Sequence, residues 1–307
     1  DVHKNAWASP LLRKLGIDPA ILPPAVGSHE HSGRVSAAGG AASGLPVGTV
    51  VAGGGADNPV AAVGVGAVRE GEALISLGTS GVAFAPTRRL RVDPRLSAHA
   101  FNHSVPDMYY LMGVMLSAGG SLRWYRDVIH GGTYSQITDE ASKIPPGAEG
   151  LFFQPYLQGE RTPLRDSSAR ASFTGLSGAH GKAHLSRAVL EGITFGLKDC
   201  LELVRSLRVP LKNLTATGGG AKNKMQLQLQ ADIFGLPIRT VAVDEGPAFG
   251  AAILASVTAG HFRTVPEASD AAVRKGPVIR PVPSRTRAYA EIYRDFKKIY
   301  PALKSAE

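Results

Sequence analysis

Apolar residues follow two different patterns along the chain. Short apolar and β-branched stretches that end at glycine predict buried strands, most clearly over residues 49–52, 73–77 and 213–217. Elsewhere, apolar residues recur every three or four positions, as expected for helices. The longest such pattern covers residues 183–207.

Weaker forms of the same patterns fill most of the remaining chain. Further strands are predicted over residues 81–85, 99–104, 108–112, 151–157 and 237–243. Further helices are predicted over residues 7–15, 117–128, 223–234, 247–259 and 285–303. Strands that alternate with helices in this way indicate an α/β fold. Gly192 and Gly196, one turn apart in the longest helix, predict that another element packs closely against it.

The stretch Gly53–Pro59 joins a predicted strand to a run of small apolar residues. Its glycines predict a tight turn. Pro59 fits the first position of a helix, where its missing N–H costs nothing, so Asn58 is the expected N-cap. Asp57 then lies at the mouth of the turn, where the helix dipole favours an ionised carboxylate. Two interpretations remain open: a capping pair, or an aspartate placed to act on a substrate.

Two further glycine-rich turns follow predicted strands, at Gly78–Gly81 and Gly218–Gly220. Thr79 and Ser80 add hydroxyl groups at the tip of the first turn. Backbone N–H groups in such turns hold anions, particularly before a helix. The turns therefore predict phosphate binding, although each also fits a plain tight turn. The Walker A and dinucleotide-binding patterns do not occur in the sequence.

The composition narrows the classes of function. The chain has 307 residues, 44% of them hydrophobic, enough for one large or two medium domains. No apolar run reaches the ~18 residues of a membrane span. The net charge of +9 comes without a nucleic-acid-binding motif, so neither nucleic acid nor a membrane is an expected partner. The single cysteine, Cys200, fits a helix core and a reducing cytoplasm.

Phosphoryl transfer is the chemistry that these residues suit best. The sequence has no Gly-x-Ser-x-Gly motif, and Asp57, Glu160 and Glu191 have no spacing that implies a carboxylate pair. His29 and His31 lack a third ligand nearby and are more typical of a solvated surface. Phosphoryl transfer needs bound phosphates, a metal ion and one carboxylate that deprotonates the acceptor hydroxyl. Asp57 suits that last role.

Together, these motifs make the chain similar to the C-terminal part of FGGY-family carbohydrate kinases. The family signature is met over residues 171–191 by Phe173, Gly175, Leu176, His184, Leu185, Ala188 and Glu191. Residues 50–66, 74–84, 99–126, 155–163 and 217–236 carry the rest of the resemblance. The segment Met112–Trp124 looks more like the xylulokinases of the family than its glycerol kinases.

This resemblance implies an actin-like ATPase or ribonuclease-H-like fold, with two such domains and a cleft between them for ATP and sugar. Residues 1–66 would be the last segment of the first domain, and residues 67–307 the second, nucleotide-binding domain. The rest of the first domain, with a metal-binding aspartate and most sugar contacts, would precede Asp1. The chain alone is therefore expected to have little kinase activity.

The resemblance also assigns roles to single residues. Asp57 would be the general base near Mg²⁺, and Asp57 and Asn58 would face the sugar. The nucleotide would lie against Gly78, Thr79, Ser80, Gly218, Gly219, Gly220, Asn223 and Gly250. The Glu160–Thr162 loop would be structural, at the domain interface. Ala56 is an extra residue before Asp57 relative to the common family form, which predicts a displaced carboxylate.

The expected reaction is phosphorylation of D-xylulose to D-xylulose 5-phosphate in the cytoplasm, with ATP and Mg²⁺ as cofactors. The expected partners are the sugar, ATP, the missing N-terminal kinase domain and, as a candidate dimer, a second copy of the chain. Two alternatives stay open: a kinase for another ketose or polyol of the same family, and a non-catalytic nucleotide-binding remnant.

Overall fold

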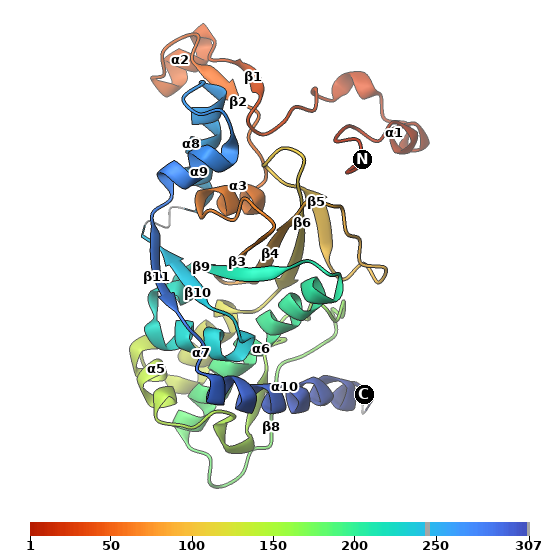
Figure 1. The fold of residues 1–307 in the computed structure, drawn as a ribbon. Helices are drawn as coiled ribbons and strands as arrows, with labels where there is room; N and C mark the ends of the chain where they lie inside the picture. Colours follow the sequence, from red (N-terminus) through yellow and green to blue (C-terminus); the bar gives the residue numbers. More distant parts are fainter. Residues whose placement is uncertain (243–245, 306–307) are drawn as a thin grey trace.

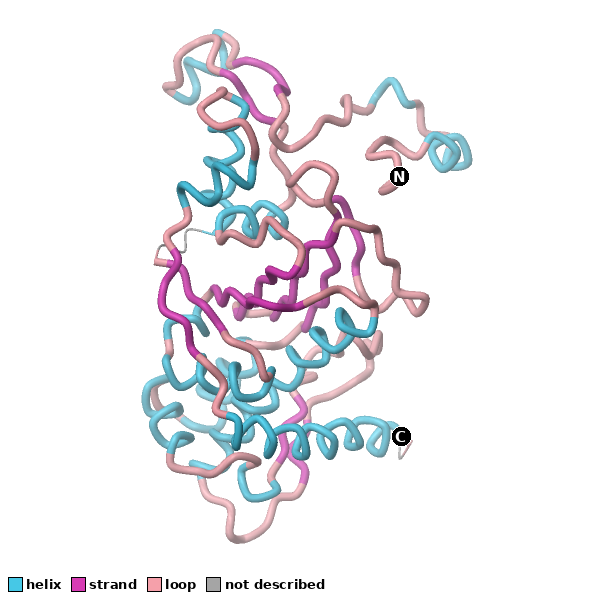
Figure 2. Tube along the Cα trace, in the orientation of Figure 1, coloured by secondary structure: helices cyan, strands magenta, loops and turns pink. Residues whose placement is uncertain are grey.

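A mixed sheet forms the centre of the structure, a computed structural model that describes residues 1–242 and 246–305 (Figure 1). Within these described parts the sheet has seven strands, in the order β11-β10-β9-β3-β4-β6-β5. The strands are β3 (Gly71–Leu77), β4 (Gly81–Thr87), β5 (His99–Asn102), β6 (Tyr109–Met115), β9 (Leu211–Thr217), β10 (Ile238–Val241) and β11 (Lys275–Ile279). Figure 2 shows the sheet between helices, as predicted for an α/β fold.

Strands β3 and β9 are parallel neighbours, and each leads into a glycine turn. Because they run in the same direction, with Ser76 opposite Thr217, their carboxyl ends meet at one edge of the sheet. β9 is also parallel to β10, whereas the other paired strands of this sheet are antiparallel. β3 and β4 form the hairpin predicted around Gly78. The turns that follow β3 and β9 therefore lie side by side.

Helices cover both faces of the sheet (Figure 1). One layer contains α4 (Gly119–Trp124), the π-helix η2 (Tyr125–His130), α5 (Tyr134–Ser142), α6 (Lys182–Ser206), α7 (Lys224–Phe234) and α10 (Pro283–Lys304). The other layer contains α3 (Asp57–Gly64), α8 (Gly246–Thr258) and α9 (Val265–Ala272). The side chains of β3 alternate between them: Ile75 is buried with residues of α6, and Leu74 with residues of α3.

The two glycines of α6 allow the close packing that the sequence predicts. A Cβ on Gly192 would lie 2.1 Å from the carbonyl oxygen of Phe153 in β7 (Phe152–Gln154), which pairs with β8 (Ser172–Thr174). A Cβ on Gly196 would lie 3.0 Å from Sδ of Met115. Cys200 on the same helix is fully buried against Gly113, which confirms its place in the core.

Residues 1–56 extend away from the sheet in Figure 1, whereas α3 lies against it. Before α3 they form α1 (Ser9–Leu15), the 3-10 helix η1 (Pro19–Ile21), β1 (His31–Arg34), α2 (Ala37–Ser43) and β2 (Val50–Ala52). Side-chain hydrogen bonds attach residues 1–56 to the rest of the described chain. Thr258 donates to the carbonyl oxygen of His29 (2.7 Å), and Asn102 donates to that of Val2 (3.0 Å).

Most predicted strands and helices are present, with shifts at their ends. Helices α5 and α9 and strand β11 were not predicted, because they are short and carry few large apolar residues. The predicted strand at 237–243 ends at Val241, and Val243 lies outside the described residues. Among the described helices, no apolar one is long enough to cross a membrane.

Candidate active site

Asp57 is the first residue of α3 and is exposed to solvent. The turn before it requires glycine at two positions. Gly54 has a φ of +71°, and a Cβ on Gly53 would lie 2.4 Å from the carbonyl oxygen of Gly27. The strand, tight turn and helix predicted for this stretch are confirmed, but the strand is not buried as predicted, because Val51 is 42% exposed.

The N-cap predicted at Asn58 is wrong. The cap residue is Ala56, whose backbone is extended, and no side chain caps the helix. Asn58 lies inside the first turn, where its backbone N–H (2.8 Å) and Nδ2 (3.1 Å) both donate to Oδ1 of Asp57. Pro59 is the third helical residue, a position whose N–H still has no acceptor within the helix. Asn58 therefore holds the Asp57 carboxylate.

The Gly78–Ser80 hairpin tip is hydrogen-bonded to the start of α4. The backbone N–H groups of Ala118 and Gly120 donate to the carbonyl oxygen of Thr79 (3.0 and 2.9 Å), and that of Gly119 to Gly78 (2.8 Å). A Cβ on Gly119 would lie 2.4 Å from the Gly78 oxygen, so only glycine allows this approach. These hydrogen bonds consequently fix the backbone of the hairpin tip relative to α4.

The Gly218–Gly220 turn packs directly on the end of β3. Gly218 has a φ of +77°, and a Cβ on Gly220 would lie 2.9 Å from Cβ of Leu77. The turn leads into the 3-10 helix η4 (Gly219–Lys222) and then α7. Asn223 caps α7 through Oδ1, which accepts from the N–H of Gln226 (3.0 Å). Its Nδ2 donates to Oγ1 of Thr138 at 3.3 Å.

A cavity of about 280 Å³, here called the turn cavity, opens between these two turns. Five predicted nucleotide-binding residues line it: Gly78, Thr79, Gly219, Gly220 and Asn223. It is also lined by Leu77, Gly119, Leu122, Arg123, Tyr134, Thr138, Leu190 and Gln226. The structure thus brings together residues that are far apart in the sequence and leaves room for a ligand beside them.

Arg123 is the one cationic side chain among the described residues that line the turn cavity. Its Nη2 donates to Oγ1 of Thr79 at 2.9 Å, which fixes the guanidinium beside the hairpin. Guanidinium groups pair well with phosphate oxygens. Arg123 was not predicted as a site residue, because an arginine in a helix is usually solvated.

A second cavity of about 350 Å³, here called the aspartate cavity, contains Asp57. It is lined by Asp57, Asn58, Ala61, Val65, Leu74, Ser76, Thr217, Gly218, Gly246 and Pro247. Gly218 lines this cavity, while the next two residues of the same turn, Gly219 and Gly220, line the turn cavity. A single turn of the chain therefore borders both spaces.

Two predicted ligand residues lie elsewhere. Ser80 donates to the carbonyl oxygen of Leu116 (3.3 Å), and it is not among the residues lining either cavity. Gly250 lies where α8 crosses α3, and a Cβ there would be 1.8 Å from the carbonyl oxygen of Val60. The structure therefore gives Gly250 a packing role. Glu245, the residue before α8, lies outside the described residues.

The Glu160–Thr162 loop lies beside β6, and its expected place at the domain interface stays a prediction. Its hydrogen bonds in the described part of the chain run to β6 and the residues around it, all within residues 67–307. The N–H of Thr162 donates to the carbonyl oxygen of Val114 (3.0 Å), and Oγ1 of Thr162 accepts from the N–H of Val114 (3.1 Å). Oε1 of Glu160 accepts from the N–H of Leu116 (3.0 Å). The loop continues the sheet edge where β5 has ended, because Val114 and Leu116 still have backbone groups to satisfy there.

Asp57 is the one carboxylate that lines the aspartate cavity in the described structure. No group of three or more His, Cys, Asp or Glu side chains suited to a metal ion is found among the described residues. Mg²⁺ is commonly held by one or two carboxylates together with waters and substrate phosphates. A single exposed carboxylate beside a cavity fits that requirement.

The Asp57 carboxylate affects the pKa of a buried tyrosine in the sheet, Tyr110. Tyr110 of β6 is buried beside Phe84, with ring centroids 4.3 Å apart. Burial, followed by the nearby Asp57 carboxylate, raises the pKa of Tyr110 to about 12. Tyr110 therefore stays neutral at physiological pH.

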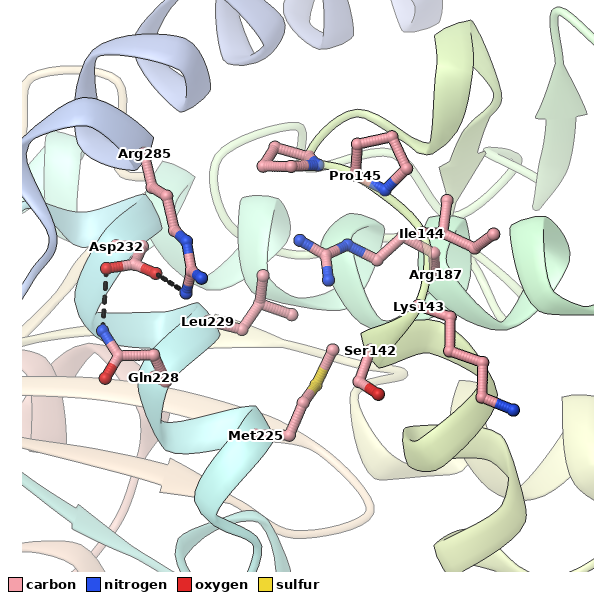
Figure 3. Close-up of a pocket in the computed structure, with 11 residues that line it drawn as sticks. Ser142, Lys143, Ile144, Pro145, Arg187, Met225, Gln228, Leu229, Asp232 and Arg285 are labelled. Carbon is pink, nitrogen blue, oxygen red and sulfur yellow. Dashed lines mark hydrogen bonds and ion pairs between the residues drawn. The ribbon is translucent and has the colours of Figure 1, made fainter.

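A third cavity, of about 470 Å³, lies apart from the predicted site residues, between α5, α6, α7 and α10 (Figure 3). Arg187 and Arg285 point into it from opposite sides, and Asp232 pairs with Arg285 at 3.5 Å. Arg187 is itself paired with Glu191 (2.6 Å) and bonded to Tyr289, within the core. This space, here called the helix cavity, contains none of the residues predicted for ATP or sugar.

The chain is similar in sequence to known carbohydrate kinases. The model of the FGGY family of carbohydrate kinases, C-terminal domain, matches residues 73–259, and that of the N-terminal domain matches residues 1–64. The chain is 38% identical to a xylulose kinase of Bacillus subtilis over 99% of its length and 61% of that protein. It is 40% identical to a xylulose kinase of Staphylococcus epidermidis over 92% of its length and 58% of that protein.

Solved structures give the same result for the fold. The structure of a xylulose kinase from Rhodospirillum rubrum superimposes with a TM-score of 0.90 at 30% identity, covering 99% of this chain and 62% of that one. The chain thus spans about three-fifths of the length of these relatives. The actin-like ATPase, or ribonuclease-H-like, fold expected from the sequence is confirmed. The chain belongs to the FGGY family of carbohydrate kinases.

Proposed function

We propose that the chain is the nucleotide-binding part of an ATP-dependent sugar kinase that converts D-xylulose to D-xylulose 5-phosphate. The observation that carries this proposal is the position of the Gly218–Gly220 turn, which borders both the turn cavity and the aspartate cavity. A nucleotide in the first cavity can direct its phosphates across the turn towards Asp57. The names of the xylulose kinases that the chain resembles support D-xylulose as the acceptor.

The proposed organisation has two domains. Residues 1–66 are assigned to the first domain of the family and residues 67–307 to the second, and the family matches at 1–64 and 73–259 support this division. The acceptor sugar would then be bound between Asp57 and further parts of the first domain. The fully buried Cys200 thiol agrees with a reducing cytoplasm as the working compartment.

ATP binding is assigned to the two glycine turns and Arg123. Gly219 and Gly220 line the space for the phosphates, where turns of this kind offer backbone N–H groups, and Arg123 supplies the positive charge. Leu122, Tyr134 and the other mostly apolar lining residues suit the base and ribose.

Asp57 is proposed as the general base. In the reaction, the acceptor hydroxyl oxygen bonds to the γ-phosphorus of ATP, the bond from that phosphorus to the bridging oxygen breaks, and the hydroxyl proton moves to Asp57. Asn58 supports this role because its two N–H groups orient Oδ1 and leave Oδ2 available for the proton. Mg²⁺, held by Asp57 and the phosphates, would neutralise phosphate charge.

The test is Asp57→Asn in a polypeptide that combines this chain with a complete N-terminal family domain. Asparagine preserves shape and cannot accept the proton, so D-xylulose-dependent ADP formation should fall by about a thousandfold or more while ADP affinity stays within about twofold. Asn58→Ala serves as the milder companion, with a loss of about tenfold. Near-normal turnover of Asp57→Asn would remove Asp57 as base, and faster turnover of another sugar would reassign the acceptor.

A further inference from the structure

Glu160 is a buried carboxylate that the proposed reaction does not use. Its side chain is 3% exposed, and it lies in the irregular loop between β7 and β8. Oε1 accepts from the backbone N–H groups of Leu116 (3.0 Å) and Arg161 (2.6 Å). Oε2 is buried without a hydrogen-bond partner among the described residues. A buried charged group of this kind calls for a reason.

The partner of Glu160, Leu116, begins the segment that braces the Gly78–Ser80 hairpin. The carbonyl oxygen of Leu116 accepts from Oγ of Ser80 at 3.3 Å. The next N–H groups, of residues 118–120, donate to the carbonyl oxygens of Gly78 and Thr79. One continuous segment, residues 116–120, therefore connects Glu160 to both hairpin carbonyls and to the Ser80 hydroxyl.

The loop that carries Glu160 is attached independently of this contact. The N–H of Thr162 donates to the carbonyl oxygen of Val114, and its Oγ1 accepts from the N–H of Val114 and donates to the carbonyl oxygen of Ser97 (2.8 Å). The backbones of Glu160 and Asp166 also exchange two hydrogen bonds (2.8 and 2.9 Å). Loss of the Glu160 carboxylate would therefore release Leu116 and leave the loop in place.

We propose that Glu160 is a positioning residue: through Leu116 it holds residues 116–120, and thereby sets the Gly78–Ser80 hairpin for phosphate binding. The inference rests on the proposed nucleotide site in the turn cavity. It goes further, because Glu160 touches neither cavity and acts through the backbone alone.

The surroundings of Glu160 make this hold depend on pH. Burial, together with the nearby Asp199 carboxylate, raises the pKa of Glu160 to about 7, whereas the backbone N–H donors and Arg161 oppose this shift. Cys200 and Tyr156, which also face it, are neutral because burial raises the pKa of each. Asp199 has its own pKa raised by burial to about 6.

Ionised Glu160 accepts stronger hydrogen bonds than the neutral acid. The hold on Leu116 should therefore be tight above pH 7 and looser below it. The contribution of the phosphates to ADP affinity should therefore be larger above pH 7 than below it, whereas the contribution of the base and ribose should not change with pH.

The test compares ADP with adenosine by calorimetry, between pH 6 and 8.5, on the 307-residue chain and three variants. Glu160→Gln should weaken ADP about tenfold at pH 8 and adenosine less than twofold. The ADP affinity of this variant should still vary with pH as far as ADP itself titrates. The difference between its pH profile and that of wild type therefore gives the contribution of Glu160. Asp199→Asn keeps the Glu160 carboxylate and removes the negative charge near it. The midpoint of the pH dependence of ADP affinity should therefore lie at lower pH than in wild type. Thr162→Val should lower stability and leave the ratio of ADP to adenosine affinity unchanged.

A second measurement does not depend on the Glu160 variant folding. Amide hydrogen exchange of residues 116–120 in the wild-type chain, corrected for intrinsic rates, should show more protection at pH 8 than at pH 6. Equal losses of ADP and adenosine affinity in Glu160→Gln, or equal protection at both pH values, would overturn the proposal. If wild type binds neither ligand, the nucleotide site itself is wrong and this role falls with it.

Discussion

Gly218 and Leu77 are in direct backbone contact, because a Cβ on Gly218 would lie 2.8 Å from the carbonyl oxygen of Leu77. This contact joins the ends of the parallel strands β9 and β3. It places the glycine turn after β9 against the hairpin after β3, and the two cavities on either side of the turn. The arrangement of the site therefore depends on the absence of one side chain.

The first prediction concerns that contact. Gly218→Ala should destabilise the chain by about 1–3 kcal/mol, since its φ of +77° with ψ of −169° is a conformation for glycine and its Cβ would strike Leu77. Gly219→Ala is the matched control, because open space surrounds its Cβ position. Urea unfolding of both variants measures the difference. Equal stabilities would contradict the contact.

The second prediction concerns the charge in the turn cavity. Arg123→Gln should weaken ADP binding about tenfold and adenosine binding less than twofold, because the guanidinium faces the space assigned to phosphates. The effect should shrink as salt is raised. Arg294→Gln, an exposed change on α10, should leave both affinities unaltered. Calorimetry with the two ligands makes the comparison, and an equal loss for both would place Arg123 away from the phosphates.

These two predictions also show where the sequence was informative. Asp57, Gly78 and Gly218 could be singled out because three glycine turns after strands occur in one chain that also resembles a kinase family. Arg123 could not, because arginine in a helix is usually solvated, and only the fold shows which space it faces. The cap was misplaced for a related reason: Ala56 has no capping side chain, so the sequence favoured Asn58, whose amide is instead engaged by Asp57.

The remaining features were missed for two different reasons, an overlooked local pattern and contacts between distant residues. Helix α5 begins with a capping box formed by Thr133 and Gln136, a pattern that could have been read in advance. Its residue Thr138 enters the turn cavity through a tertiary contact with Asn223 that no spacing encodes. Parallel pairing of β3 with β9 likewise joins residues that are distant in the chain.

A third prediction concerns the ion pair beside the helix cavity. Arg187 and Glu191 lie one turn apart on α6, and both are bonded to Tyr289 of α10 in the core. Glu191→Ala should cost about 3–5 kcal/mol, because it leaves a buried guanidinium without its partner. Glu202→Ala, which removes a half-exposed pair with Arg205 on the same helix, should cost less than about 1 kcal/mol. Denaturant unfolding distinguishes them, and similar costs would refute the buried pair.

A fourth prediction concerns acid. His103 is buried in its neutral form: Nε2 donates to the carbonyl oxygen of Ala67 (3.1 Å), and Nδ1 accepts from the N–H of Val105 (3.0 Å). Burial lowers the pKa of His103 to about 4. The unfolded chain therefore binds more protons than the folded one between pH 6.5 and 4, so stability is lost as pH falls through that window.

The size of this loss is about 3 kcal/mol. His103→Gln keeps a neutral amide at the same place and should lack this component. The free energy of unfolding of the wild-type chain should thus fall relative to the variant between pH 6.5 and 4. Parallel pH profiles would show that His103 is protonated in the folded chain as readily as in the unfolded one.

The central claim is that ATP lies across the two glycine turns with its phosphates towards Asp57. Hydrogen exchange with and without Mg·ATP, followed by mass spectrometry on the 307-residue chain, tests it most directly. The account predicts added protection at residues 57–58, 78–80 and 218–223. Protection confined to the helix cavity of Figure 3, at residues 142–146 and 283–287, would contradict it.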